Sequence, residues 1–313
     1  MQKPSPNRIA FDKIAAILAI LAAASFDYGF RIWMLAGIAS AVSVLTASLF
    51  QLMKKKPLAD CIPDALCIGL ILLLMLPATI SISMVIMSCI FAIIIGRVMF
   101  GGKENPVIPP AAVGYCFCLL NNRAQTVSFP AEKEILPLFQ LGGIEMADGV
   151  SSLWNRGGKF TMSVSEWLTG LPCQPIGTGS IVLLTAVAVV LILRRAASGW
   201  VVIPALAAHI TSSLLISNLQ HPVSAFMGSV LTNQLLIAFL FLHADPEYAP
   251  PTLAGIAYGF AVGFASFFAT RVLYIYDAPV LMAVLFSPFV IWLRRMMMFE
   301  EDAEPSAERG TAA

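Results

Sequence analysis

Ionisable side chains within apolar stretches are the first candidates for chemistry in this sequence. Asp64 stands near the start of the apolar run DCIPDALCIGLILLLMLP, and Asp245 follows a second apolar run in the string HADP (243–246). A carboxylate at membrane depth is costly, so it marks an ion or ligand contact by default. Each also has a structural interpretation, as an interfacial helix cap for Asp64 and as a cap or part of an interfacial pair for Asp245.

A second candidate is the glycine- and proline-rich segment FGGKENPVIPPAAVGY (100–115). Gly101 and Gly102 free the backbone, and three prolines delay the start of the next helix. Backbone amides and carbonyls left open at membrane depth are tolerated only where they are buried in protein or line a cavity. Such a cavity suits an ion or a planar ligand, and the alternative interpretation is a tight cytoplasmic turn.

Other cofactor chemistries lack their sequence patterns here. The six cysteines contain no CxxC pair, so we expect no metal or iron–sulfur cluster bound by this chain alone. The sequence also has no GxGxxG fingerprint for a dinucleotide. Nicotinamide and iron–sulfur chemistry would therefore come from partner subunits.

The composition indicates the elements that must position these residues. Hydrophobic residues make up 58% of the 313 positions and charged residues 12%, with a mean hydropathy of +0.84. A soluble domain carries about 25% charged residues, twice this share. The composition therefore argues against a soluble enzyme, a disordered chain and a nucleic-acid binder, and it predicts a multi-pass membrane protein.

Ten segments are apolar and long enough for membrane-spanning helices, which need about 20 residues. With the N-terminus inside, most of the 19 Lys and Arg residues fall on the cytoplasmic side, so both termini are predicted to be cytoplasmic. The ten predicted spans are 11–26, 32–53, 62–79, 82–99, 107–121, 178–195, 200–218, 224–243, 252–270 and 278–294.

The two halves of the sequence resemble each other. LLLMLPATI (72–80) resembles FLFLHADPEY (239–248), and GRVMFGGKENP (96–106) resembles ATRVLYIYDAP (269–279). The offset is five spans, so the second copy is predicted to lie inverted in the membrane, as in many transport proteins. The predicted fold is all-α, with a first five-helix repeat (1–121), an external loop (122–177), a second five-helix repeat (178–295) and an acidic cytoplasmic tail (296–313).

Over roughly residues 10–295 the chain resembles the D subunit of Rnf-type ion-translocating electron-transport complexes, which is homologous to the B subunit of the sodium-pumping NADH:quinone reductase. Four features carry the resemblance, in the family's order and spacing. They are PDALCIGLILLLMLP, FGGKENPVIPPAAVGY, the external string MADGVSSLWNRGG (146–158) and HADP (243–246).

The resemblance implies a multi-pass subunit of a prokaryotic cell (inner) membrane. In that family electrons pass between ferredoxin or NADH and NAD or quinone, and the transfer drives Na⁺ or H⁺ outward. FMN is esterified to the Thr of an external D-G-x-S-G-A-T motif, and riboflavin accompanies the B-type subunit. The implied partners are the other membrane, flavin and iron–sulfur subunits and the lipid bilayer, with no nucleic acid.

The external motif departs from the family pattern. Asp148, Gly149 and Ser151 match its D, G and S, but Ser152 stands where Gly belongs and Trp154 where the acceptor Thr belongs. Indole has no hydroxyl to esterify, and the Ser152 hydroxyl lies two positions early. We therefore expect FMN or riboflavin without covalent attachment through the usual Thr.

The first-half segment also departs from the pattern: one family Asn is replaced by Ile108, while Asn105 remains. Asp64, Asn105 and Asp245 are predicted to be polar contacts of a cavity formed where the repeats meet.

The residues are also compatible with two other functions. A five-plus-five inverted arrangement also resembles urea and ammonium channels, although a pore should show polar mid-span residues in both repeats. The polar candidates here are His209, Thr211, Asn233 and Gln234, all in the second half. The third possibility is a redox-inactive structural subunit that holds partners together.

Overall fold

A computed structural model describes residues 6–59, 61–100, 102, 105–139, 142–149, 152, 173–216, 230, 234–250 and 252–293. These residues are mostly helical, and one two-stranded antiparallel sheet lies among them. Some residues named in the sequence-based predictions lie outside the described residues. They are Gly101, Ser151, Asn233, Trp154 and the acidic tail.

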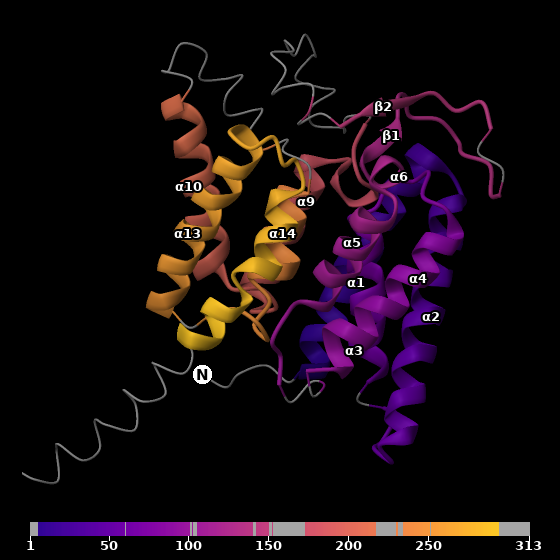
Figure 1. Ribbon diagram of the computed structural model, residues 1–313, viewed down its shortest axis with the longest axis horizontal. Coiled ribbons are helices and arrows are strands. Elements are labelled where there is room, and N and C mark those ends of the chain that lie inside the picture. Colours follow the sequence, from indigo (N-terminus) through magenta and orange to yellow (C-terminus); the bar gives the residue numbers. More distant parts are fainter. Residues whose placement is uncertain are drawn as a thin grey trace, which may run out of the picture.

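The helices form two groups that follow the order of the chain (Figure 1). The first half contains α1 (Pro6–Tyr28), α2 (Arg31–Met53), α3 (Ile62–Leu74), α4 (Ile82–Ile93), η1 (Ile94–Val98) and α5 (Pro110–Asn121). The second half contains η3 (Ile176–Thr178), α9 (Ile181–Leu193), α10 (Gly199–Ile216), α12 (Leu235–Ile237), η4 (Ala238–His243), α13 (Thr252–Arg271) and α14 (Ala278–Leu285).

A small layer lies between the two halves in sequence and covers one end of the first group (Figure 1). It consists of α6 (Arg123–Val127), β1 (Ser128–Pro130) and β2 (Met146–Asp148), with Phe129 of β1 opposite Ala147 of β2. An ion pair of 2.8 Å between Lys133 Nζ and Asp27 Oδ2 ties the segment after β1 to the end of α1.

The predicted membrane character of the helices is confirmed in outline. Among the described residues, four helices are long and apolar enough to cross a membrane: 7–28, 31–53, 199–216 and 253–271. Four shorter apolar helices span 62–74, 82–98, 110–121 and 181–193. The ten-span count, the inverted repeat and the membrane orientation stay predictions.

The helix predicted over 62–79 is shorter in the structure. α3 ends at Leu74, and the chain continues as a buried loop over 75–80. Arg31, at the start of α2, is 1% exposed and supplies the donors that this loop needs. Its Nε donates to the carbonyl of Ala78 and its Nη2 to the carbonyl of Ile80, each at 2.8 Å. Buried carbonyls need such partners, so the arginine makes the interrupted span possible.

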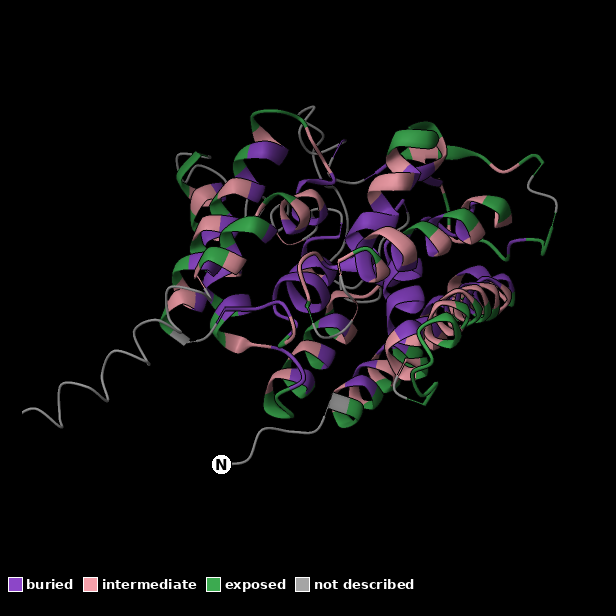
Figure 2. Ribbon diagram, turned by 60° about the horizontal axis from the view of Figure 1, so that its bottom comes forward, coloured by how far each residue is buried: buried purple, intermediate pink, exposed green. Residues whose placement is uncertain are grey.

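Close packing of α10 against α13 depends on glycines that recur every fourth residue on α13. A Cβ built at Gly259 would lie 2.6 Å from the carbonyl oxygen of Val201, and one at Gly263 would overlap the carbonyl oxygen of Ala205. Small residues at this spacing let two membrane helices approach through their backbones. Figure 2 shows the buried residues of the helices turned inward and the exposed ones outward.

Two segments of the described chain, η1 and η4, are wide π-type helical turns. The amide of Met99 bonds the carbonyl of Ile94 at 2.9 Å after η1, and the amide of Ala244 bonds the carbonyl of Phe239 at 3.0 Å after η4. Such turns are rare and frequently mark functional sites. Arg97 lies within η1, and Asp245 follows shortly after η4.

Candidate functional site

Six polar residues from both halves form a cluster at one end of the helix groups, named here the junction cluster. Its members are Lys13 of α1, Asp64 of α3, Arg97 of η1, and Asp245, Glu247 and Tyr248 of the loop after η4.

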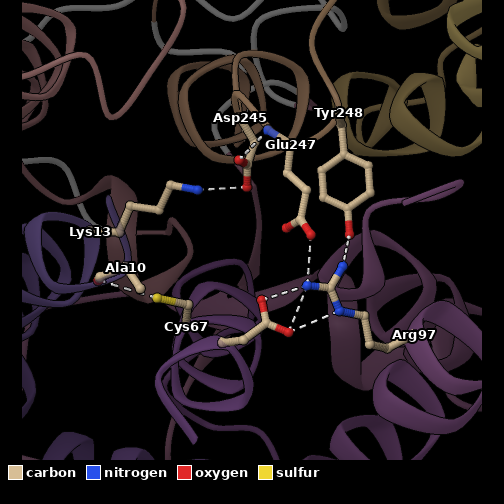
Figure 3. Close-up of polar contacts among 8 residues, drawn as sticks. Ala10, Lys13, Cys67, Arg97, Asp245, Glu247 and Tyr248 are labelled. Atoms are coloured by element: carbon tan, nitrogen blue, oxygen red, sulfur yellow. Dashed lines mark hydrogen bonds and ion pairs between the residues drawn. The ribbon is translucent and has the colours of Figure 1, made fainter. Parts of the chain in front are cut away.

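Arg97 is the centre of the junction cluster (Figure 3). Its Nε donates to Asp64 Oδ2 at 2.8 Å and its Nη2 to Asp64 Oδ1 at 2.7 Å, which is a bidentate pair within the first half. The same guanidinium lies 2.8 Å from Glu247 Oε1 and donates to the hydroxyl of Tyr248 at 2.9 Å. The planar fork of arginine can serve several acceptors at once, so one side chain joins both halves.

A second ion pair also crosses between the halves. Lys13 Nζ lies 2.6 Å from Asp245 Oδ2, with 8% and 10% of the two side chains exposed. Asp245 Oδ1 also accepts a hydrogen bond of 3.1 Å from the amide of Glu247, which shapes the loop.

Charge in the junction cluster is unbalanced. Three carboxylates, those of Asp64, Asp245 and Glu247, face the cations of Arg97 and Lys13. Burial raises the pKa of Glu247 to about 7, although Arg97 opposes the shift. Glu247 is thus the member of the cluster that takes up a proton near neutral pH.

A cavity of about 570 Å³ lies beside the junction cluster and receives walls from both halves. Its polar wall carries Lys13, Asp64 and Asp245, and its apolar wall includes Ile68 and Phe241. Pro109 and Pro110 also line it. An apolar pocket of this size with a few convergent polar groups is typical of small-molecule sites.

The sequence-predicted residues are only partly brought together. Asp64 and Asp245 line the same cavity. From the glycine- and proline-rich segment it is the prolines that reach the cavity, while Asn105 is exposed and donates to the carbonyl of Phe100 at 3.0 Å. Gly102 is half-buried, with a φ of +86° that suits glycine.

The residues of the external motif lie in another part of the molecule. Asp148 ends β2, and the amide of Ser152 donates to the carbonyl of Gly149 at 2.9 Å in a turn just after it. The Ser152 hydroxyl is buried and has no hydrogen-bond partner among the described residues. Its position therefore offers little access to a modifying enzyme.

Sequence reasoning missed four members of the junction cluster: Lys13, Arg97, Glu247 and Tyr248. Lys13 entered only the count of cytoplasmic positive charges, and Arg97 entered that count and the repeat string GRVMFGGKENP (96–106). The available signal was a cation within an apolar helix, as in IIIGRVMF (93–100), together with the charge that follows Asp245 in DPEY (245–248).

Fold and site together define a multi-pass helical membrane protein whose two halves meet at a charged cavity. The chain belongs to the NQR2, RnfD, RnfE family, whose family model matches residues 2–297.

Two curated relatives are similar to parts of the chain. One is the D subunit of the ion-translocating oxidoreductase complex of Erwinia tasmaniensis, 29% identical over 155 residues, which are 48% of this chain and 42% of that protein. Another, the protein of the same name from Citrobacter koseri, is 34% identical over 95 residues, which are 29% of this chain and 27% of that protein. The matched regions thus span less than half the length of these relatives.

Proposed function

We propose that this chain is the membrane subunit of an Rnf- or Nqr-type complex, in which electron transfer from ferredoxin or NADH to NAD or quinone drives Na⁺ or H⁺ across the membrane. Family membership and the names of the two relatives support the class. The observation that carries the proposal is the cavity between the halves, with the ion pairs of Arg97 and Lys13 beside it.

The cavity fits a flavin in the kinds of groups that line it. An isoalloxazine ring has one apolar edge and one edge of hydrogen-bond donors and acceptors. Phe241 and Ile68 suit the first edge, while Lys13, Asp64 and Asp245 suit the second. When bound, FMN or riboflavin would supply electron transfer in one- or two-electron steps.

The chain's own residues then have separate tasks. The bidentate pair of Arg97 with Asp64 fixes the carboxylate against the cavity wall. Glu247 holds a proton beside the same arginine and can release it when the local charge changes. The apolar wall excludes water, which strengthens each of these interactions.

Flavin content tests this proposal. The complex would be purified from its native membrane through a tag on this chain, denatured in acid, and read for flavin in the pellet and the supernatant. We expect flavin in the supernatant, and a large loss of it in Asp64→Asn and Asp245→Asn. The exposed Glu134→Gln is the matched control and should keep the wild-type content.

Wild-type complex without flavin in either fraction would contradict the redox role and favour a channel or a structural subunit. Unchanged flavin content in both cavity variants would mean that the flavin binds outside this cavity.

A further inference from the structure

A second polar network lies between the halves, apart from the junction cluster. Asp277 directly precedes α14 and is 4% exposed, and its Oδ1 accepts a hydrogen bond of 2.7 Å from the hydroxyl of Tyr115 on α5. Tyr115 is fully buried. The two residues are 162 positions apart in sequence, and α5 and α14 pack against each other in Figure 1.

Gln234 extends this network and leaves one group unsatisfied. Its Nε2 donates to the hydroxyl of Tyr115 at 2.6 Å and to the carbonyl of Met75 at 2.8 Å. Gln234 is 0% exposed, and its Oε1 has no hydrogen-bond partner among the described residues. A buried amide oxygen of this kind requires a donor, and a water molecule is the usual one.

Ends of helices converge on the network. Met75 follows the last residue of α3, Gln234 precedes α12, and Asp277 precedes α14. Gln234 adopts a left-handed backbone with a φ of +58°, which is costly for a residue other than glycine. The interruption of α3 at Leu74 is a feature shared with transport proteins, in which ion sites commonly lie where discontinuous helices end between two halves.

Several ionisable side chains lie on the described elements that pack around Asp277, and none of them is a carboxylic acid. Tyr115, Cys116 and Arg123 approach it from α5 and α6, His243 approaches α14 from η4 through the carbonyl of Pro279, and Tyr258 and Arg271 belong to α13. Among the described residues, no Lys or Arg forms an ion pair of 4.0 Å or less with Asp277. Burial raises the pKa of Asp277, and the hydrogen bond from Tyr115 opposes that rise.

We propose that Asp277 is a proton-binding site between the two halves, that Tyr115 and Gln234 position its carboxylate, and that a water bound at Gln234 Oε1 connects it to the proton supply. The step adds one proton to the carboxylate and moves no electron. A bare metal cation fits less well, because such ions take about six or more oxygen ligands. Among the described residues, Gln234 Oε1 is the one buried side-chain oxygen of this network that has no hydrogen-bond partner. Proton binding stands independently of the function proposed above, whereas its use in transport rests on that function.

Infrared difference spectroscopy on the full chain in liposomes tests the site. The wild type should show protonated-carboxyl absorption that disappears as pH rises, with one component from Asp277 and one from Glu247. Asp277→Asn should lose the component that Glu247→Gln retains. Tyr115→Phe removes only the hydroxyl that stabilises the ionised form, so the titration midpoint should move to higher pH. Asp277→Glu should restore a titrating band, and the exposed Glu134→Gln should match the wild type.

A wild-type spectrum that Asp277→Asn leaves unchanged would overturn the proposal. If that variant does not accumulate in the membrane, an unchanged midpoint in Tyr115→Phe would overturn it equally. In vesicles with the whole complex, Asp277→Asn should stop proton uptake driven by electron transfer while flavin content stays normal. A titrating band that depends on Asp277, seen in a complex that lacks flavin, would refute the proposed function and leave the proton site standing.

Discussion

Arg97 of η1 donates a hydrogen bond of 2.9 Å to the hydroxyl of Tyr248, a residue 151 positions later in the chain. The same guanidinium holds Asp64 of its own half and Glu247 of the other half. Because Arg97 is 7% exposed, these contacts are made largely away from water. The arginine is therefore the main polar link between the two halves at the cavity.

Removing this link should destabilise the protein strongly. Arg97→Gln leaves the carboxylates of Asp64 and Glu247 without their cation, and breaking a buried pair in this way costs about 3–5 kcal/mol. The two carboxylate side chains are 19% and 25% exposed, so we expect a loss near the lower end. Thermal unfolding in lipid nanodiscs measures it.

Arg97→Lys keeps the charge but loses the bidentate geometry, so it should fall between the wild type and Arg97→Gln. The exposed Lys54→Gln is the control for loss of a positive charge. Equal melting temperatures for Arg97→Gln and Lys54→Gln would show that the link carries no stability.

Glu247 should make stability depend on pH. Burial raises its pKa from the ordinary 4.5 to about 7, so between these values the folded protein holds a proton that the unfolded chain has released. The unfolded state then binds fewer protons, and stability falls as pH rises from about 4.5 to about 7. Measured unfolding free energies at pH 5 and pH 8 should differ by roughly 2 kcal/mol from this group.

Glu247→Gln should flatten this dependence, because the amide does not titrate. Glu134→Gln, exposed and far along the chain, should keep the wild-type slope. A slope that survives in Glu247→Gln would assign the titration to another carboxylate.

The glycines of α13 should tolerate almost no added side chain. Gly259→Val places carbon atoms against the carbonyl oxygen of Val201, and the two helices must separate to accommodate them. Overpacking of a buried contact costs about 1–3 kcal/mol, and backbone on the opposing side leaves little room to relax. We expect a loss at or above the upper end, measured as a lower melting temperature.

Gly37→Ala on α2 is the matched control, since a Cβ there meets no atom within 4 Å. Alanine is the better helix former by up to about 1 kcal/mol, so this variant should be neutral or stabilised. A similar loss in both variants would mean that the close approach of α13 to Val201 does not account for the effect of Gly259→Val.

Apolar helices could be predicted from the sequence because a hydrophobic run is a local signal. The helical membrane class followed from it, and so did the choice of Asp64 and Asp245, which the structure brings to one cavity. Their part in function there stays a prediction. Helix ends were less accessible: the end of α3 at Leu74 depends on donors from Arg31, and nothing in the local sequence indicates that contact.

The rest of the site could not be predicted because its contacts join distant parts of the chain. No pattern near Arg97 indicates that Glu247 and Tyr248 are its partners, and no pattern near Tyr115 indicates Asp277. Asn105 shows the opposite error. Its place in a family-like segment suggested a cavity contact, but its side chain is exposed and bonds within its own loop.

The sequence of the external motif leads to a prediction about the covalent attachment of flavin. Trp154 occupies the position of the acceptor Thr, and the Ser152 hydroxyl is buried, so the wild-type chain should gain no flavin mass when co-expressed with a flavin transferase. The triple variant Ser152→Gly, Leu153→Ala, Trp154→Thr restores the family's D-G-x-S-G-A-T pattern and should gain the mass of one FMN less one water. Intact mass spectrometry after denaturation measures both chains.

The matched control carries Trp154→Ala with the same two other changes, which restores the turn without the hydroxyl. It should remain unmodified, because a phosphoester needs that oxygen. Flavin on the wild-type chain would instead identify Ser152 as an acceptor and require its turn to open. An unmodified triple variant would mean that residues beyond the seven-residue motif decide recognition by the transferase.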